Sequence, residues 1–183
     1  MAKIIIPLAT GFEEIEAVSI IDICRRANIE VIIAGVDDVT VTGANGITIV
    51  TQISIEAISS KSIDMIVLPG GAEGTNILAS NKTVQSLLKE FKKKDKFISA
   101  ICAAPYALHK AGVLNQNYTC YPSFEKNIRA KGYEEASDIV IDGKVLTSRG
   151  PGTAMCFALE IVKILTNDHT YISVKNGLLA THC

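Results

Sequence analysis

Short apolar runs that resemble fully buried strands alternate along the chain with stretches of helical periodicity. Strands of this kind belong to parallel sheets that helices cover on both faces. We expect strands at residues 3–9, 30–36, 64–70, 96–102, 138–143 and 144–150. We expect helices at about residues 13–28, 83–94, 105–111, 123–131 and 152–165, and a short one near the C-terminus. The pattern predicts an open, doubly wound α/β sheet, whose ligands bind outside the carboxyl ends of the strands.

Two features of the sequence modify the predicted sheet. Residues 39–43 and 47–51 flank a turn at Ala44-Asn45-Gly46 and predict a hairpin that is added to the main sheet. Pro7 lies inside the first strand, where it removes a hydrogen-bond donor, so it can shorten that strand.

Length and composition predict one domain, residues 1–183, in the cytoplasm. The chain has 48% hydrophobic residues and a formal net charge of -1, which disfavours disorder and nucleic acid as a partner. No apolar window approaches the ~18 residues of a membrane span, and the first residues do not resemble a signal peptide. The five cysteines are odd in number and scattered, which predicts neither a disulfide framework nor a zinc site. We expect no metal and no cofactor.

Unusual residues follow three of the predicted strands: the segment 9–16 with its three glutamates, Gly70-Gly71, and Cys102. The carboxyl ends of parallel strands meet at one edge of a sheet, so a carboxylate, backbone N–H groups and a thiol are expected to converge there.

Cys102 has two interpretations. It ends a strand and precedes a helix, the context of a nucleophile elbow, and a helix N-terminus favours a thiolate. Free cysteine is also among the most buried residue types, so an inert core position fits equally well. Gly71 and Ala103 can offer backbone N–H groups to an oxyanion, although Gly70-Gly71 is also an ordinary turn sequence.

Two glutamates are candidates to assist Cys102. Glu13 and Glu16 both precede apolar residues at helical spacing, so either can be the partly buried carboxyl that exchanges a proton with the thiol. His109 lies seven residues beyond Cys102, about 10 Å along a helix, too far to act as its base. His182-Cys183 is expected to be a frayed tail rather than a metal site.

The motifs GFEEIEA, VLPGG, AICAAP and LTSRGPGTA, in this order, resemble the ThiJ/PfpI superfamily and, more narrowly, its Parkinson-disease-associated protein deglycase branch. The resemblance covers essentially the whole chain. It implies a flavodoxin-like three-layer α/β/α sandwich, similar to class I glutamine amidotransferases. It also implies a homodimer whose interface includes the first helix and the hairpin, with Arg26 nearby.

By the same resemblance, Cys102 is the reactive, oxidation-sensitive cysteine, and Glu16, in preference to Glu13, is the protonated carboxyl against its sulfur. Gly71 and Ala103 are the positions whose backbone N–H groups line the anion pocket.

Two positions depart from the pattern of the best-known member. Tyr121 stands where that member has a histidine before proline, and a phenol is a poor base at neutral pH. Asn45 stands where that member has an arginine, which puts an anion-binding role of the hairpin turn in doubt.

The resemblance implies a cofactor-independent deglycase or glyoxalase that acts on small α-oxoaldehydes, such as methylglyoxal and glyoxal, or on their adducts. The alternative is an oxidative-stress sensor and chaperone that works through oxidation of Cys102. A peptidase is disfavoured, because such relatives are expected to place a histidine directly after the cysteine, where this chain has Ala103.

Overall fold

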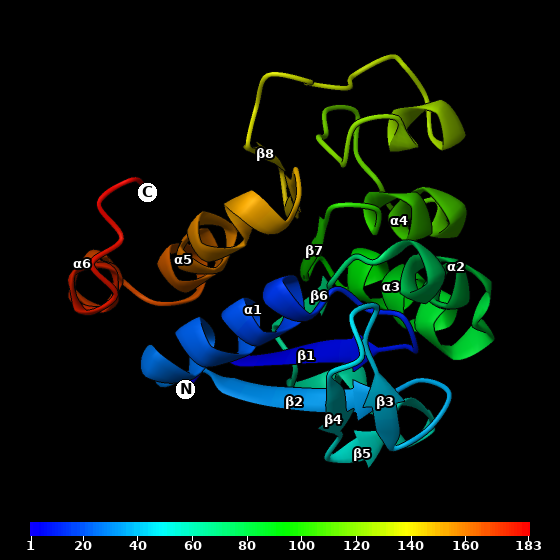
Figure 1. Cartoon of the computed structure of the whole chain (residues 1–183), viewed down its shortest axis with the longest axis horizontal. Coiled ribbons are helices and arrows are strands. Elements are labelled where there is room, and N and C mark those ends of the chain that lie inside the picture. Colours follow the sequence, from blue (N-terminus) through cyan, green and yellow to red (C-terminus); the bar gives the residue numbers. More distant parts are fainter.

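Seven strands form one sheet through the middle of the computed structural model, which describes residues 1–183 (Figure 1). Their order is β5-β2-β1-β6-β7-β9-β8, and only β8 runs antiparallel to its neighbour. The strands are β1 (Lys3–Leu8), β2 (Glu30–Gly35), β5 (Ile53–Ser54), β6 (Met65–Leu68), β7 (Phe97–Ile101), β8 (Ile139–Asp142) and β9 (Val145–Ser148). The predicted doubly wound α/β fold is confirmed.

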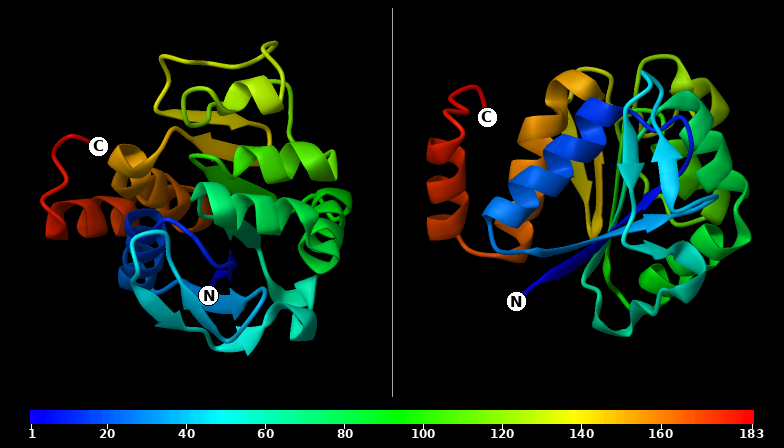
Figure 2. Two further views of the ribbon diagram at one scale, coloured as in Figure 1. Left: turned by 45° about the vertical axis from the view of Figure 1, so that its right-hand side comes forward. Right: turned by 60° about the horizontal axis from the view of Figure 1, so that its bottom comes forward.

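Helices cover both faces of this sheet (Figure 2). One layer contains α1 (Glu14–Arg26) and α5 (Ala154–Leu165), with α6 (Asp168–Gly177) packed outside α5. The other contains α2 (Ala72–Ser80), α3 (Lys82–Lys93) and α4 (Pro105–Ala111). In β1, Ile4 and Ile6 pack under α1 and α5, while Ile5 packs toward α3 and α4. Each side chain buried in this way contributes about 1.5–3 kcal/mol, which explains the unbroken apolar runs.

Local sequence signals set several helix ends. The side chain of Asn81 accepts a hydrogen bond from the Val84 N–H at 3.0 Å and caps α3. Pro105 occupies the first turn of α4, and Gly112 ends that helix at a φ of +70°. Pro7 is tolerated within β1 because the pairing of β1 with β6 extends only over Ile4 and Ile5.

Two expectations about the fold are wrong, and one helix has no counterpart among the expected elements. The hairpin of β3 (Thr40–Thr42) and β4 (Thr48–Val50) forms a separate two-stranded sheet, because β5 pairs with β2 at the edge of the main sheet. Residues 123–131 form only a 3₁₀ turn, η3 (Phe124–Asn127), which begins after Ser123 at a φ of +81°. The helix α2 was not predicted, because Gly74, Thr75 and Asn76 are poor helix formers.

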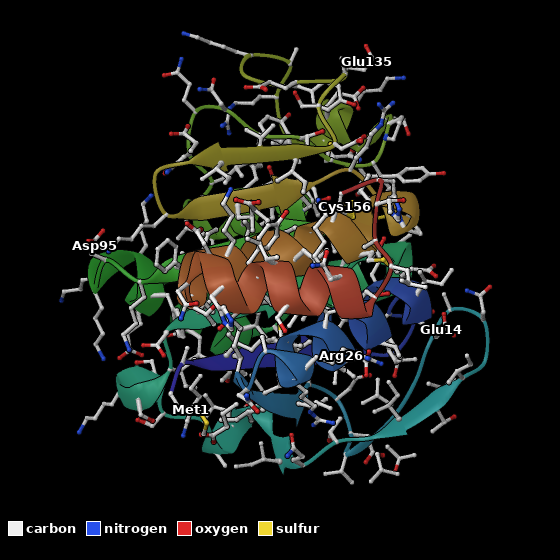
Figure 3. All side chains as sticks on the ribbon, turned by 90° about the vertical axis from the view of Figure 1, so that its left-hand side faces the viewer. Met1, Glu14, Arg26, Asp95, Glu135 and Cys156 are labelled. Atoms are coloured by element: carbon white, nitrogen blue, oxygen red, sulfur yellow. A yellow bond between two sulfur atoms is a disulfide. The ribbon has the colours of Figure 1, made fainter.

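The C-terminal segment is tied to the helical layer rather than frayed. Cys183 forms a disulfide with Cys156 of α5, with a Cα–Cα distance of 5.1 Å (Figure 3). The expectation that the chain has no disulfide is therefore wrong, because residues 27 positions apart are brought together only by the packing of α6 on α5. None of the helices is both long and apolar enough to span a bilayer.

Candidate active site

Cys102 lies on a sharp turn between β7 and α4. Its φ is +63°, a region that few non-glycine residues adopt. Two backbone hydrogen bonds hold it there: its N–H donates to Ser148 O at 2.9 Å, and its C=O accepts from the Tyr121 N–H at 2.8 Å. The side chain is 8% exposed. The turn thus has the geometry of a nucleophile elbow, although the G-x-S-x-G glycines are absent.

Glu16 of α1 is fully buried beside this thiol. Its Oε2 accepts a hydrogen bond from the Gly70 N–H at 2.7 Å. Its Oε1 is buried without any hydrogen-bond partner, while the carboxyl group interacts directly with the Cys102 side chain. Glu13 lies at the wall of the cavity instead, so the structure brings Glu16, and not Glu13, to the sulfur.

The two side chains control each other's charge. Burial raises the pKa of Glu16 to about 7, although the hydrogen bond from the Gly70 N–H and the contact with the Cys102 side chain oppose this shift. Burial, followed by the negative charge of Glu16, raises the pKa of the Cys102 thiol, while the N–H groups of Gly71 and Ala103 lower it. A proton on Glu16 removes the charge that opposes the thiolate, so the pair titrates as one unit.

This result corrects one expectation. The sequence predicted that a helix N-terminus favours the thiolate, but α4 begins only at Pro105 and burial dominates. The local N–H groups of Gly71 and Ala103 act in the expected direction, because they lower the pKa of the Cys102 thiol.

Neighbouring atoms approach both glycines after β6 so closely that no side chain fits at either position. A Cβ on Gly70 would lie 2.6 Å from Cys102 Cβ and 2.7 Å from Glu16 Oε2. Gly71 has a φ of +90°, and a Cβ there would lie 2.1 Å from Gly11 O. The Gly-Gly sequence therefore allows the ends of β1 and β6 to approach the thiol of Cys102. An ordinary turn does not require such close contacts.

A small cavity opens in front of Cys102. It has a volume of about 250 Å³ and is lined by Glu13, Gly71, Ala72, Cys102, Ala103, Tyr121, Phe124 and Pro151. An adjoining hollow of about 310 Å³ is lined by Tyr121, Pro122 and residues 149–153. Tyr121 and Pro151 belong to both, and Tyr121 is 47% exposed. None of the three histidines lines either space, so no imidazole is placed to act as a base for Cys102.

Sequence reasoning missed the role of Glu14. Its carboxylate accepts hydrogen bonds from the N–H and the side chain of Asn45, at 2.7 and 3.0 Å, and from the Ile47 N–H at 3.2 Å. Burial alone raises the pKa of Glu14, but these bonds more than offset it and hold the pKa below its usual range. Asn45 thus joins the hairpin to Glu14 of α1, which Figure 3 labels, and no sequence motif indicated this contact.

Comparison with known proteins identifies the family of this chain. The model of the DJ-1/PfpI family matches residues 2–164. The chain belongs to the DJ-1/PfpI family. This DJ-1/PfpI protein is 36% identical over 178 residues to protein dj-1beta of Drosophila melanogaster, covering 96% of this chain and 95% of that protein. It is also 36% identical over 172 residues to the glutathione-independent glyoxalase DJR-1.2 of Caenorhabditis elegans, covering 93% of this chain and 90% of that protein.

Solved structures confirm the flavodoxin-like sandwich of this DJ-1/PfpI protein. The crystal structure of Drosophila melanogaster DJ-1beta superimposes with a TM-score of 0.94 at 36% identity and covers 97% of each chain. The structure of oxidized Toxoplasma gondii DJ-1 superimposes with a TM-score of 0.93 at 34% identity and covers 98% of each chain.

Proposed function

We propose that this DJ-1/PfpI protein is a cofactor-independent, cysteine-dependent glyoxalase that converts small α-oxoaldehydes to hydroxy acids and also acts as a deglycase on their adducts. The observation that carries the proposal is Cys102 on a strained turn, with the buried carboxyl of Glu16 against its thiol. The name of the Caenorhabditis elegans relative, a glutathione-independent glyoxalase, supports the reaction class.

Methylglyoxal illustrates the chemistry. The thiol proton of Cys102 passes to Glu16, and the sulfur attacks the aldehyde carbon, so that the carbonyl electron pair moves to oxygen. The N–H groups of Gly71 and Ala103 stabilise this oxyanion, which then takes the proton from Glu16 to give a hemithioacetal.

Glu16 then moves a proton between carbons. Its carboxylate removes the hydrogen of the former aldehyde carbon and returns it to the neighbouring carbon, while the hydroxyl proton passes to the neighbouring oxygen. The product is a thioester of lactate on Cys102, and water hydrolyses it to lactate and the free thiol. A pKa of about 7 suits Glu16 to accept and donate this proton near neutral pH. An adduct on an amine or thiol would be released when Cys102 replaces that group at the same carbon.

The proposal is tested by lactate production from methylglyoxal. Wild type should form lactate, whereas Cys102→Ala should not, and Glu16→Gln should lose at least about 100-fold in kcat because proton transfer contributes 10²–10⁴-fold. The matched control is Cys24→Ala, which removes a buried cysteine of α1 and should keep wild-type turnover. Wild-type lactate formation no faster than that of Cys102→Ala would refute the enzyme proposal.

A second candidate function uses the same thiol as an oxidation sensor linked to chaperone activity. Two peroxide molecules would convert the thiolate to a sulfinate and two waters. The N–H groups of Gly71 and Ala103 would hold its oxygens, and protonated Glu16 would donate to it through the otherwise unpartnered Oε1. Addition of two oxygens to Cys102 by mild peroxide, seen by intact mass and absent in Cys102→Ala, tests this function; failure of wild type to gain them contradicts it.

We also propose that the protein is a cytoplasmic homodimer without nucleic-acid or membrane partners. Exposed apolar side chains on α1 and on the hairpin support the dimer: Ile15 is 59% exposed, Val18 47%, and Val50 73%. Arg26, at the end of the same helix, pairs with Asp22 at 2.6 Å. Light scattering should give twice the chain mass for wild type and a monomer for Val18→Asp; a monomeric wild type would contradict the proposal.

A further inference from the structure

Three side chains that commonly bind metals meet where the C-terminal tail crosses α5. Cys156 lies in the first turn of α5, and His182 and Cys183 follow α6 (Figure 3 labels Cys156). Cys156 and Cys183 form the disulfide, and the ligand atoms of all three residues lie within 4.8 Å of one another. None of them lines the cavity in front of Cys102. The group is therefore separate from the candidate active site.

A disulfide explains two of these residues but not the third. Pairing Cys156 with Cys183 does not require an imidazole nearby, and His182 is exposed, so core packing does not place it there. The tail backbone holds it: Ala180 is buried, and the Cys183 N–H donates to Ala180 O at 3.3 Å. The imidazole of His182 is thus kept beside the two sulfurs by a structured turn.

We infer that Cys156, His182 and Cys183 bind one Zn²⁺ ion when the disulfide is reduced. Two thiolates and one imidazole supply three of the four ligands of a tetrahedral zinc site, and water completes it. Zinc bonds of about 2.3 Å to sulfur and 2.0–2.1 Å to nitrogen place tetrahedral ligands about 3.6–3.8 Å apart. The ligand atoms already lie within 4.8 Å, so after reduction the sulfurs must separate and the imidazole nitrogen must approach by about 1.2 Å at most.

The surroundings of Cys156 also favour a metal-bound thiolate. Cys156 is the third residue of α5, a helix of 12 residues, and the positive end of a helix stabilises negative charge in its first turn. Cys156 and Cys183 are half-buried while His182 is exposed, so the site is open to an entering ion.

The disulfide and the zinc ion exclude each other. A dithiol reductant supplies two electrons and two protons, cleaves the Cys156–Cys183 bond and becomes a disulfide itself. Zinc binding then displaces the two thiol protons to solvent, and two Zn–S bonds and one Zn–N bond form. In either state the tail remains attached to α5, through the disulfide or through the metal. The site would therefore bind zinc under reducing conditions and release it on oxidation.

Zinc titration of the full-length chain tests this inference. Wild type reduced with a phosphine and freed of metal should take up one equivalent of Zn²⁺ in competition with a chromogenic chelator. Oxidised wild type, checked by intact mass for the disulfide, should take up none. Cys156→Ser should lose binding, and His182→Ala should weaken it by at least about tenfold, since even outer-shell changes cost 10–100-fold. Co²⁺ in place of Zn²⁺ should show thiolate charge-transfer absorption only in the reduced protein.

Two matched variants identify the site. His169→Ala removes an exposed histidine of α6, and Cys102→Ala removes the active-site thiol; both should bind zinc as wild type does. All variants should keep wild-type circular dichroism. The inference is overturned if reduced wild type binds no zinc, if His182→Ala binds as tightly as wild type, or if binding disappears in Cys102→Ala but persists in Cys156→Ser. Methylglyoxal turnover is measured separately, so failure of this site leaves the proposed enzyme activity untouched.

Discussion

Replacing Glu16 with glutamine isolates the energetic cost of its buried charge. The folded state raises the pKa of Glu16 from 4.5 to about 7, so it binds the proton more tightly than the unfolded chain does. Protonated Glu16 therefore stabilises the fold fully below pH 4.5, and this stabilisation is lost as pH rises to about 7. The glutamine side chain of Glu16→Gln is uncharged and has the same shape, and its oxygen can still accept from the Gly70 N–H.

The magnitude follows from the two pKa values. The difference between a pKa of 4.5 and one of about 7 corresponds to about 3 kcal/mol, most of which develops between pH 5 and pH 8. Relative to wild type, Glu16→Gln should thus gain roughly 2–3 kcal/mol of unfolding free energy over this range. With an m-value of roughly 2 kcal/mol/M, the difference in urea midpoint should grow by about 1 M.

Urea denaturation followed by circular dichroism at pH 5, 6, 7 and 8 measures this difference. Groups common to both proteins cancel when the variant is compared with wild type at each pH. Glu135→Gln, in an exposed loop, is the matched control and should give a difference that does not vary with pH. A difference between Glu16→Gln and wild type that stays constant from pH 5 to pH 8 would refute the argument that burial raises the pKa of Glu16.

Three further perturbations follow from the geometry. Gly70→Ala should reduce both turnover and alkylation of Cys102 by at least tenfold, measured with methylglyoxal and iodoacetamide, because its Cβ would displace Cys102 and Glu16. Glu14→Ala should lower the unfolding free energy by about 1–3 kcal/mol and accelerate hydrogen exchange in the hairpin turn, since the N–H groups of Asn45 and Ile47 lose their hydrogen bonds to a charged carboxylate. Cys183→Ser should lower stability by about 3.5 kcal/mol relative to the oxidised wild type, measured by urea denaturation without reductant, because the disulfide joins residues 27 positions apart.

Much of the fold and of the candidate site could be predicted before the structure. The buried strands were recognisable because both faces of β1 and β6 pack against helices, which requires apolar residues without alternation. The end of β7 placed Cys102 on the ligand-binding edge of the sheet, as the topology of parallel sheets demands. The choice between Glu13 and Glu16 needed the family resemblance, because helical spacing put both beside apolar surface.

Interactions between distant segments escaped prediction. The hairpin separates from the main sheet because β5, a strand of two residues, pairs with β2 at its edge, and Glu14 binds the hairpin turn. The helix α2 forms despite poor helix formers because Leu78 joins the apolar core under that layer. The prediction that the pKa of the Cys102 thiol is lowered was also wrong. Burial and the carboxyl of Glu16, which comes from a distant segment, outweigh the local N–H groups.

The sequence by itself determined the layered α/β architecture and the edge of the sheet that carries the candidate site, because the local apolar pattern identifies buried strands and the residues that follow them. Only the tertiary structure decided which charges and thiols meet. It buried Glu16 against Cys102 and raised the pKa of both, and it brought Cys156 to Cys183 and His182 across 27 residues of chain. Those outcomes depend on desolvation and on distances through space, and neither quantity is encoded in the spacing of residues along the chain.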